Sequence, residues 1–326
     1  MAALTQLVNN RKMTLLFDLE HELDFNENQS YLFDLKDYYG LLCVEGDKCS
    51  EFLQGQLSAN ITDITPNQMH QSAYCNLKGR ILALPDVCYW NDFYLLLPQD
   101  LLKPVQSSLA KTAVFSKVQV TLQPSFHVFG LYTKDRQVNL PLSLPQNINQ
   151  ATFNDDYFCY CAAPNLFIII SIKDNVSDLT KSFQQHSQWR GSLAWHFLYI
   201  KHGLFEVYPD TRGAFLPHRL DLHQTGHLDF NKGCYKGQEV IARMHYRSKP
   251  KHTMKTLWLK SDEPLLAGQK IMAAESQKTI GELVDWCPAP DNRYLIAASM
   301  LFEHPMQVLL EGNQTPSTLT PHHDSA

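Results

Sequence analysis

The hydrophobic positions follow two different patterns along the chain. Up to about residue 250, apolar runs of strand length such as residues 166–172 (LFIIISI) alternate with helical patterns such as residues 101–113. After residue 250 the chain turns into short strand-like segments with turns about every eight to twelve residues, which is typical of a small β-barrel or sandwich. The sequence therefore predicts an α+β region followed by an all-β unit.

The length of the chain and two polar stretches predict where its units divide. With 326 residues, the chain is long enough for two or three compact units. Residues 135–150 are rich in Pro, Asn and Gln, and we expect a loop or a seam between two subdomains there. Residues 314–326 are polar, and we expect them to be disordered. We therefore assign residues 1–248 to the α+β region and residues 249–313 to the β-barrel.

Composition and charge argue against two classes of protein. Hydrophobic residues make up 44% of the chain and the formal net charge is −5, whereas a protein that coats nucleic acid non-specifically is basic overall. The longest apolar run, residues 166–172, is far shorter than the roughly 20 residues of a membrane-spanning helix. The N-terminus also lacks the apolar core of a secretory signal. We expect a soluble, cytoplasmic protein with no membrane partner.

One of the eight cysteines, Cys234, has unusual neighbours in the segment DFNKGCYKGQEVIAR. Two glycines and two lysines surround it: Gly233, Gly237, Lys232 and Lys236. The pKa of a thiol falls near cations and near a helix N-terminus, and residues 238–247 are typical of a helix, so this loop favours an ionised thiol. Alternatively, the glycines only form a tight turn and the cysteine packs as a small hydrophobic residue.

The other cysteines and the histidines do not define a metal site by their spacing. No two cysteines form a C-x-x-C pair, and the spacing of a self-contained zinc or iron–sulfur site is missing, so we expect no tightly bound metal. His218, His223 and His227 lie in a loop-like stretch without helical spacing. Solvated histidines are the favoured interpretation, and metal ligands or a base for a thiol hydrolase are the alternatives.

A local excess of positive charge surrounds the same segment. Residues 232–260 contain eight basic residues and one acidic residue, Glu239. In an acidic chain, such a patch indicates an anionic partner, either RNA or a small polyanion such as a folate with a glutamate tail. The alternative is an ordinary solvated face.

The segment KGCYKGQE, residues 232–239, carries a resemblance to a known family. It is similar to the motif K-G-C-Y-x-G-Q-E of the YgfZ family of folate-binding proteins, which are relatives of the glycine-cleavage T-protein, an aminomethyltransferase. The motif residues beside the cysteine are Lys232, Gly233, Tyr235, Gly237, Gln238 and Glu239. Further similar stretches are FLQGQLSANI (52–61), CNLKGR (75–80), AVFSKV (113–118) and FLPHRLDL (215–222), so that the resemblance covers about residues 35–312.

The resemblance implies a fold, a ligand and a role. The fold would be T-protein-like, with intertwined α+β units around a central channel and a C-terminal β-barrel. The ligand would be tetrahydrofolate, flanked by aromatic rings that fall on Tyr39 and Trp195. The role would be to support the synthesis or repair of iron–sulfur enzymes, and through them tRNA modification. Cys234 would then be the reactive group, kept ionised by Lys232, and Arg243 or Arg247 would meet the glutamate tail.

One departure from the T-protein pattern argues against ordinary aminomethyl transfer. T-proteins carry acidic residues on the strand after the equivalent of LKGR, whereas this chain has Ala83 and Leu84 there, and alanine cannot act as a general acid or base. Three hypotheses remain: a folate-dependent accessory protein for iron–sulfur enzymes, a folate-dependent methyl or aminomethyl transferase, and an RNA-binding module. Whether the protein is an enzyme, and whether it contacts tRNA directly, are left open by the sequence.

Overall fold

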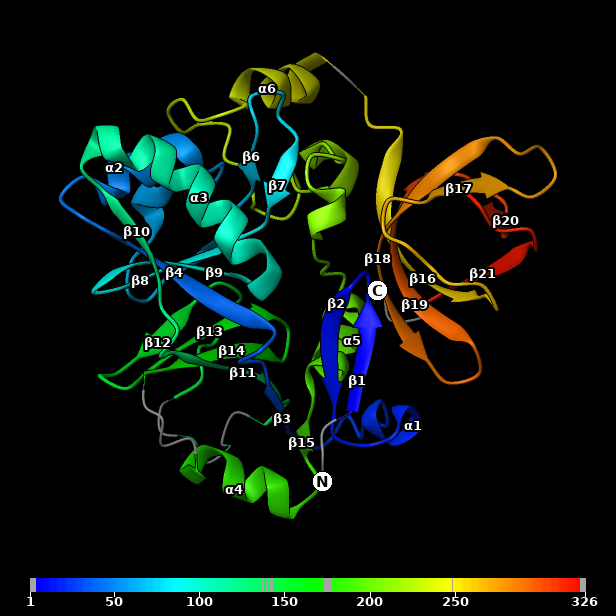
Figure 1. Ribbon diagram of the computed structural model, residues 1–326, viewed down its shortest axis with the longest axis horizontal. Helices are drawn as coiled ribbons and strands as arrows, with labels where there is room; N and C mark the ends of the chain where they lie inside the picture. Colours follow the sequence, from blue (N-terminus) through cyan, green and yellow to red (C-terminus); the bar gives the residue numbers. More distant parts are fainter. Residues whose placement is uncertain are drawn as a thin grey trace.

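Two large sheets, two hairpins and a closed barrel make up the chain in the computed structural model (Figure 1), which describes residues 4–135, 138, 140, 143–172, 177–247 and 249–322. The first large sheet has the strand order β10-β4-β9-β8-β5. These strands are β4 (Tyr39–Glu45), β5 (His70–Gln71), β8 (Asp86–Trp90), β9 (Asp92–Pro98) and β10 (Gln119–Leu122). Helix α3 (Gln99–Ser116) covers them and contacts α2 (Cys49–Gln56), because its apolar residues recur on one face.

The second large sheet has the order β12-β13-β14-β11-β3-β15. Its strands are β3 (Tyr31–Asp34), β11 (His127–Tyr132), β12 (Ala151–Phe153), β13 (Tyr157–Ala163), β14 (Leu166–Ser171) and β15 (Trp189–Arg190). Strand β14 lies between β13 and β11 and is buried along its whole length. Burial on both faces explains why its sequence is a continuous apolar run rather than an alternating pattern. Helix α4 (Ser177–Gln185) contacts β3 and β15.

The two large sheets are intertwined, as the resemblance implied. The chain contributes β3 to the second sheet, builds the first sheet with β4, β5, β8, β9 and β10, and returns to the second sheet at β11. Residues 135–150, predicted as a loop or a seam, connect two strands of one sheet, β11 and β12, so the seam is wrong and the loop interpretation fits the described part of that stretch. The change of sheet occurs between β10 and β11. Pro, Asn and Gln indicate a loop, but they do not indicate which sheets the loop connects.

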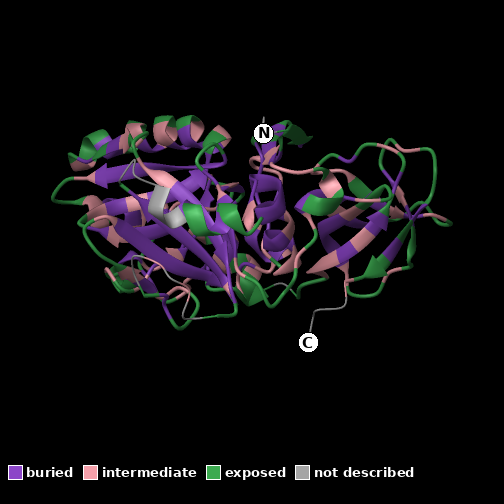
Figure 2. Cartoon of the chain, turned by 90° about the horizontal axis from the view of Figure 1, so that it is seen from below, coloured by how far each residue is buried: buried purple, intermediate pink, exposed green. Residues whose placement is uncertain are grey.

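The centre of the molecule is built around helix α5 (Ser192–Lys201), which packs on the N-terminal hairpin, the second sheet and the barrel (Figure 1). The hairpin consists of β1 (Leu4–Val8) and β2 (Arg11–Leu15) and is followed by the short helix α1 (Leu19–Glu22). A Cβ atom on Gly191 would lie 2.1 Å from the Thr14 carbonyl oxygen, so the start of α5 touches the hairpin backbone. Figure 2 shows this buried interior continuing from the sheets into the barrel.

The C-terminal unit is a closed barrel, as predicted, with the order β16-β19-β18-β17-β20-β21. Its strands are β16 (His252–Lys260), β17 (Lys270–Ala273), β18 (Thr279–Ala289), β19 (Arg293–Leu301), β20 (Gln307–Leu310) and β21 (Ser317–Pro321). Strand β21 lies inside residues 314–326, which we expected to be disordered. It pairs with β16 and β20 and buries Leu319 completely. That part of the prediction is wrong because one inward apolar side chain and backbone pairing suffice to order a polar strand; residues 323–326 lie outside the described residues.

A small hairpin and a helix complete the end of the molecule opposite α4 (Figure 1). The hairpin consists of β6 (Tyr74–Cys75) and β7 (Ile81–Ala83), and the helix is α6 (Gln238–Arg247). Three 3₁₀ turns, η1 (Ile61–Asp63), η2 (Pro209–Thr211) and η3 (Pro217–Leu220), lie in the connecting loops. In the part of the chain that the structure describes, no helix has the length and apolar character needed to span a membrane.

Candidate functional site

Two of the stretches that resemble the known family, residues 75–80 and 232–239, meet where helix α6 begins. Gly237 has a φ of +86°, and a Cβ atom there would lie 2.5 Å from the Asn76 carbonyl oxygen and 3.0 Å from the Gly79 Cα atom. The KGQE segment therefore packs backbone to backbone against the turn of the β6–β7 hairpin, as only glycine allows. Gly233 is different, because a Cβ atom there would have no heavy atom within 4 Å. A side chain is therefore excluded by close neighbours at position 237 and not at position 233.

Lys232 binds to the backbone at the end of helix α2. Its ammonium group donates hydrogen bonds to the carbonyl oxygens of Gln54, Leu57 and Ala59 at 2.8, 2.6 and 2.7 Å. Burial lowers the pKa of Lys232 to about 8, yet all three of its donors are satisfied. That this lysine keeps Cys234 ionised stays a prediction; in the structure its charged group binds three carbonyls and anchors the loop that carries the thiol.

Cys234 itself lies at the surface. Among the eight cysteines, all of which the structure describes, it is the exposed one, whereas six are buried and Cys49 is partly exposed. The nearby Lys236 ammonium lies 3.4 Å from the Tyr74 hydroxyl and 5.1 Å from the centre of that ring. The loop therefore presents an accessible thiol on a backbone that is held on both sides, by Lys232 before it and by Gly237 after it.

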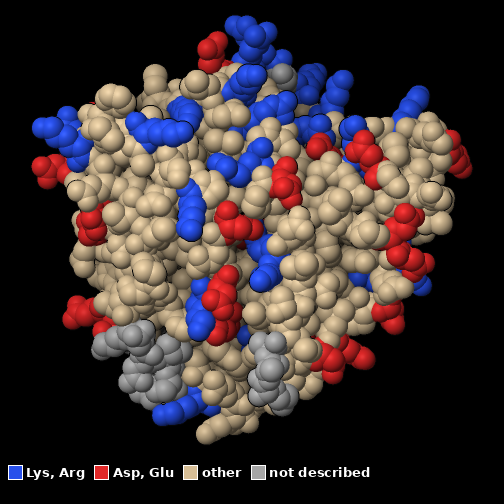
Figure 3. Space-filling model, viewed as in Figure 1, with Lys and Arg blue, Asp and Glu red and all other residues tan. Residues whose placement is uncertain are grey.

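The remaining motif residues differ in exposure: one is buried in the core and the others lie partly or fully at the surface. Tyr235 is 7% exposed, and its ring lies 5.1 Å from the Lys232 ammonium. Gln238 is partly exposed and Glu239 is exposed in the first turn of α6, where a carboxylate is favoured by the helix dipole. Arg243 and Arg247 are both exposed. They contribute to the basic face that Figure 3 shows at the α6 end of the molecule.

The two rings expected to flank a pterin lie inside the protein. Trp195 on α5 is fully buried, and it packs against Phe33, Tyr199 and the backbone of Gly130, where a Cβ atom would lie 2.2 Å from the indole ring. Tyr39 is 5% exposed. Neither ring offers a free face in this arrangement, so the predicted sandwich requires these side chains to move.

Tyr39 nevertheless belongs to a buried polar network in the centre of the chain. Its hydroxyl donates to the Glu206 carboxylate at 2.6 Å. Burial raises the pKa of Glu206 to about 7, although the Arg11 guanidinium opposes that rise. The network continues through hydrogen bonds of Tyr38 and Tyr208, the first with His196 at 3.1 Å and the second with Asp285 at 2.5 Å. Such a cluster can hold or transfer a proton near neutral pH.

A second acidic group in the interior was missed by the sequence analysis. Asp86, at the start of β8, accepts hydrogen bonds from the Tyr160 hydroxyl at 2.5 Å and from Gln71. Burial raises the pKa of Asp86 to about 6. The T-protein positions Ala83 and Leu84 carry no acid, as noted, but a carboxyl lies two residues further on. An acidic residue inside an apolar segment is the available signal for both Asp86 and Glu206.

Of the three histidines that we expected to be solvated, two are buried and His223 is partly exposed. His218 is 6% and His227 is 7% exposed, and burial lowers the pKa of each to about 4. His218 stacks on His223 with ring centres 4.9 Å apart, and His245 of α6 stacks on Phe230 at 3.8 Å. The helix and the loop before it thus bring the imidazoles of His218, His223 and His245 together, with ring centres 4.9 to 6.4 Å apart.

Another set of possible metal ligands lies in the first large sheet. Among the described residues, Cys43, Glu45 and Asp92 have ligand atoms that all lie within 4.8 Å of one another. The Cys43 thiol donates to the Glu45 carboxylate at 3.3 Å, and burial raises the pKa of this thiol to about 12. In this structure the Cys43 thiol and the Glu45 carboxylate are therefore joined by a hydrogen bond.

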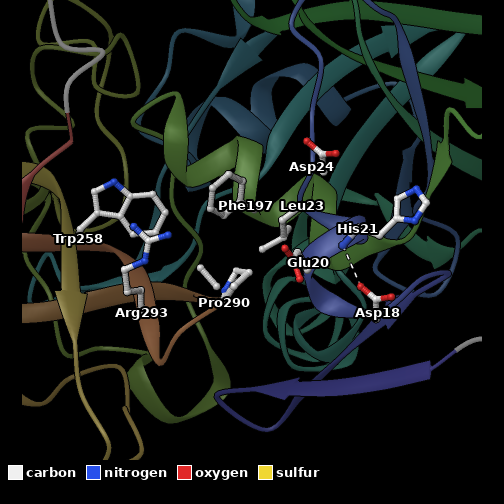
Figure 4. Close-up of a pocket in the computed structure, with 10 residues that line it drawn as sticks. Asp18, Glu20, His21, Leu23, Asp24, Phe197, Trp258, Pro290 and Arg293 are labelled. Carbon is white, nitrogen blue, oxygen red and sulfur yellow. Dashed lines mark hydrogen bonds between the residues drawn. The ribbon is translucent and has the colours of Figure 1, made fainter.

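A cleft of about 710 Å³ lies between α1, α5 and the barrel (Figure 4). Figure 4 shows Phe197, Trp258 and Arg293 on one side and the acidic side chains of the α1 region on the other. Three carboxylates line it, from Asp18, Glu20 and Asp24. These negative charges disfavour a polyanionic ligand such as a folate with a glutamate tail, and the cleft contains no residue that the sequence analysis singled out.

Comparisons with known proteins agree with this architecture. The structure is similar to that of the glycine cleavage system aminomethyltransferase T from Bartonella henselae, with a TM-score of 0.76 over 99% of this chain and 93% of that chain, at 18% identity. That likeness confirms the expected fold class. No family model matches the chain.

Three sequence relatives from different organisms share the same protein name. The chain is 24% identical over 302 residues to the tRNA-modifying protein YgfZ of Colwellia psychrerythraea, covering 90% of this chain and 92% of that protein. It is 30% identical over 241 residues to the protein of the same name from Hamiltonella defensa, covering 72% and 71% respectively. The Klebsiella pneumoniae protein is 27% identical over 227 residues, covering 68% and 69%. With the motif at residues 232–239 and the T-protein-like fold, these matches place the chain in the YgfZ family.

Proposed function

We propose that this chain is a tetrahydrofolate-binding accessory protein that supports the synthesis or repair of iron–sulfur enzymes, and thereby tRNA modification, with Cys234 as its reactive group. The observation that carries this proposal is the exposed thiol on an anchored loop. The relatives in three bacteria are named tRNA-modifying proteins, which supports the link to tRNA. The T-protein-like fold supports a relation to folate-binding proteins.

We infer the role of Cys234 from two facts: it is a single exposed thiol, and it lies on an anchored loop. An iron–sulfur cluster is held by about four thiolates, so one cysteine cannot hold a cluster alone. An exposed thiol can lose its proton to water and donate its sulfur to one iron of a cluster whose other ligands come from a partner enzyme. The fixed backbone around Cys234 favours such a contact, because the loop that carries the sulfur is already ordered and loses little conformational entropy when a partner binds.

The folate site is proposed at the buried network around Tyr39 and Glu206. A pterin carries ring N–H groups, and a carboxylate is the acceptor that pairs with them most strongly. Glu206 is a buried carboxyl in the core, and its hydrogen-bond donor Tyr39 is the residue that the resemblance assigns to the folate. Binding there requires the Tyr39 and Trp195 rings to open a face, so we expect tetrahydrofolate to change the Trp fluorescence.

Two measurements on matched variants test the proposal. Tetrahydrofolate titration above pH 7, where the Glu206 carboxyl is ionised, should show a loss of affinity of about tenfold or more in Glu206→Gln, because the variant loses a charge-assisted hydrogen bond. Cys234→Ala should bind folate normally but abolish the nucleoside modifications that depend on iron–sulfur enzymes in cells lacking the native protein. Cys49→Ala, which removes a partly exposed thiol elsewhere, should retain both properties. Loss of folate affinity in Cys234→Ala would contradict the division of roles.

A second candidate function is folate-dependent one-carbon transfer. Asp86 favours it, because its carboxyl has a pKa of about 6 and shares a hydrogen bond with Tyr160, which suits a group that exchanges protons near neutral pH. Ala83 and Leu84 remain the argument against it. Turnover of a one-carbon folate with a purified acceptor, abolished by Asp86→Asn, would support a transferase; no turnover with wild type would reject it.

A further inference from the structure

A small pocket opens beside helix α6, on the basic face of the molecule. It measures about 180 Å³, has room for one planar ring, and is lined by Met244 of α6, His218 and Arg219 of η3, and Lys249, Lys251 and His252 of the segment that leads into the barrel. The sequence analysis noted the charge of this segment but did not predict a cavity. A pocket with an apolar side chain at its wall and cations at its rim suits a flat ring attached to a negative group.

His218 is the strongest indication that the pocket receives a ligand. Its side chain is more than nine-tenths buried, and neither of its ring nitrogens has a hydrogen-bond partner among the described residues. Buried polar atoms almost always find partners, and an unpaired one costs stability. Burial lowers the pKa of His218 to about 4, so the ring is neutral at physiological pH and offers one donor and one acceptor. The edge of a nucleobase presents the complementary pair.

The rim of the pocket is cationic and accessible. Lys249 and Lys251 are exposed, as are Arg243 and Arg247 on the adjoining helix, and Figure 3 shows Lys and Arg gathered over this end of the molecule. The Arg219 guanidinium is partly neutralised by Glu282 at 3.3 Å. Positive charge of this density, on a chain whose formal net charge is −5, attracts phosphates and repels a divalent cation, which argues against a metal bound by the neighbouring histidines.

Aromatic side chains also occur next to the cations. Tyr246 is 70% exposed on α6. Next to it, the stacked rings of His245 and Phe230 form a continuous aromatic surface, with Tyr246 edge-on to both at 4.9 and 6.3 Å. Interleaved aromatic and basic side chains are the arrangement with which proteins bind single-stranded nucleic acid, because bases stack on the rings while cations follow the backbone.

We propose that the His218 pocket binds one nucleotide of a single-stranded RNA, with the base between Met244 and His218, the adjoining phosphates at Lys249 and Lys251, and a neighbouring base on Tyr246. The inference goes beyond the proposed folate function and does not depend on it. It places a direct RNA contact on the same helix that follows the Cys234 loop. A free mononucleotide has the same chemistry, and the experiment separates the two.

Fluorescence anisotropy with labelled tRNA and with a short single-stranded RNA tests the site in the full-length protein. The logarithm of affinity should fall with the logarithm of salt concentration, with a slope of about −0.7 for each phosphate that is contacted. The double variant Lys249→Gln/Lys251→Gln should make that slope shallower by about 1.4, because two contacts are lost. The matched control is Lys103→Gln/Lys111→Gln, which removes the same charge from exposed lysines on α3 and should leave the slope unchanged.

A second pair of measurements identifies the pocket itself. His218→Gln keeps a donor and an acceptor and should retain part of the affinity, whereas Met244→Trp fills the cavity and should weaken RNA binding about tenfold or more, with the salt slope preserved. An RNA affinity that does not change with salt concentration would overturn the proposal. Equal changes of the salt slope in the α3 control and in the variant of the pocket lysines would also overturn it. So would competition by a free mononucleotide as effective as by RNA, which would assign the pocket to a small molecule. Folate titration of the same variants should be unchanged, so failure of this inference is distinguishable from failure of the folate proposal.

Discussion

Replacing Lys232 with methionine separates two roles that the sequence could not distinguish, an anchor and an activator of the thiol. The substitution keeps the length of the buried chain but removes the ammonium group, whose three donors bind the carbonyls of Gln54, Leu57 and Ala59. Each carbonyl loses its partner in a largely buried position, at a cost of about 1 kcal/mol, so we expect the free energy of unfolding to fall by about 3 kcal/mol. An activating lysine would change thiol chemistry and leave stability almost intact.

The assay combines urea denaturation, followed by circular dichroism, with the rate at which Cys234 reacts with a thiol reagent in the folded protein. The control is Lys236→Met, which makes the same change in the same loop. The Lys236 ammonium has one long contact, 3.4 Å to the Tyr74 hydroxyl, and a cation–π contact with that ring, so we expect it to cost about 1 kcal/mol or less. An unfolding free energy for Lys232→Met within about 0.5 kcal/mol of wild type would refute the anchor.

Three further changes test other parts of the structure. Gly237→Ala forces a Cβ atom to within 2.5 Å of the Asn76 carbonyl oxygen at a positive φ, so thermal unfolding should show a loss of about 2 kcal/mol or more, whereas Gly233→Ala should be neutral. The buried Glu206 carboxyl keeps its proton up to about pH 7, whereas in the unfolded chain it ionises near pH 4.5, so its contribution to stability is complete below pH 4.5 and falls by about 3 kcal/mol as the pH rises to 7. Denaturation of Glu206→Gln at both pH values should lack that fall, and a pH profile identical to that of the wild type would contradict the assignment. Leu319→Ala should cost about 3 kcal/mol if β21 is a strand of the barrel, whereas equal unfolding midpoints for Leu319→Ala and the outward-facing Thr320→Ala would mean that the strand does not form.

The parts of the fold that the sequence predicted are those decided by local pattern. The apolar run that forms β14, the helical spacing of α3 and the turn-separated strands of the barrel each depend on residues within about 20 positions of one another. Strand β21 was missed because its ordering depends on pairing with β16, some 60 positions earlier. The seam was misplaced for a similar reason, since which sheet a strand joins is decided by partners distant in the sequence.

In the candidate site, too, local features could be predicted from the sequence and contacts between distant residues could not. Local sequence indicated that Cys234 lies in a glycine-containing loop before a helix. The direction of the Lys232 side chain could not be predicted, because its three acceptors lie 173 to 178 positions away in the chain. Likewise, the unusual pKa values of Glu206 and His218 could not be predicted, because they arise mainly from burial in the folded chain. A polar residue inside an apolar segment was the one local signal available for them.

The thiol and the basic face belong to one structural unit, and this constrains how a partner would approach. The Cys234 loop continues directly into α6, and Gly237 fixes the start of that helix against the β6–β7 hairpin. Because the remainder of the chain is acidic overall, an anionic partner is attracted to this end of the molecule and is repelled from the carboxylate-lined cleft at α1 (Figures 3 and 4). Attraction over a Debye length of about 10 Å orients the partner before contact is made, so a cluster enzyme that carries an RNA held by Lys249 and Lys251 would approach along helix α6, whose other end follows the Cys234 loop. On this argument, neutralising the two lysines should slow the delivery of a cluster enzyme to Cys234 without changing the thiol itself, and raising the salt concentration should produce the same effect in the wild-type protein.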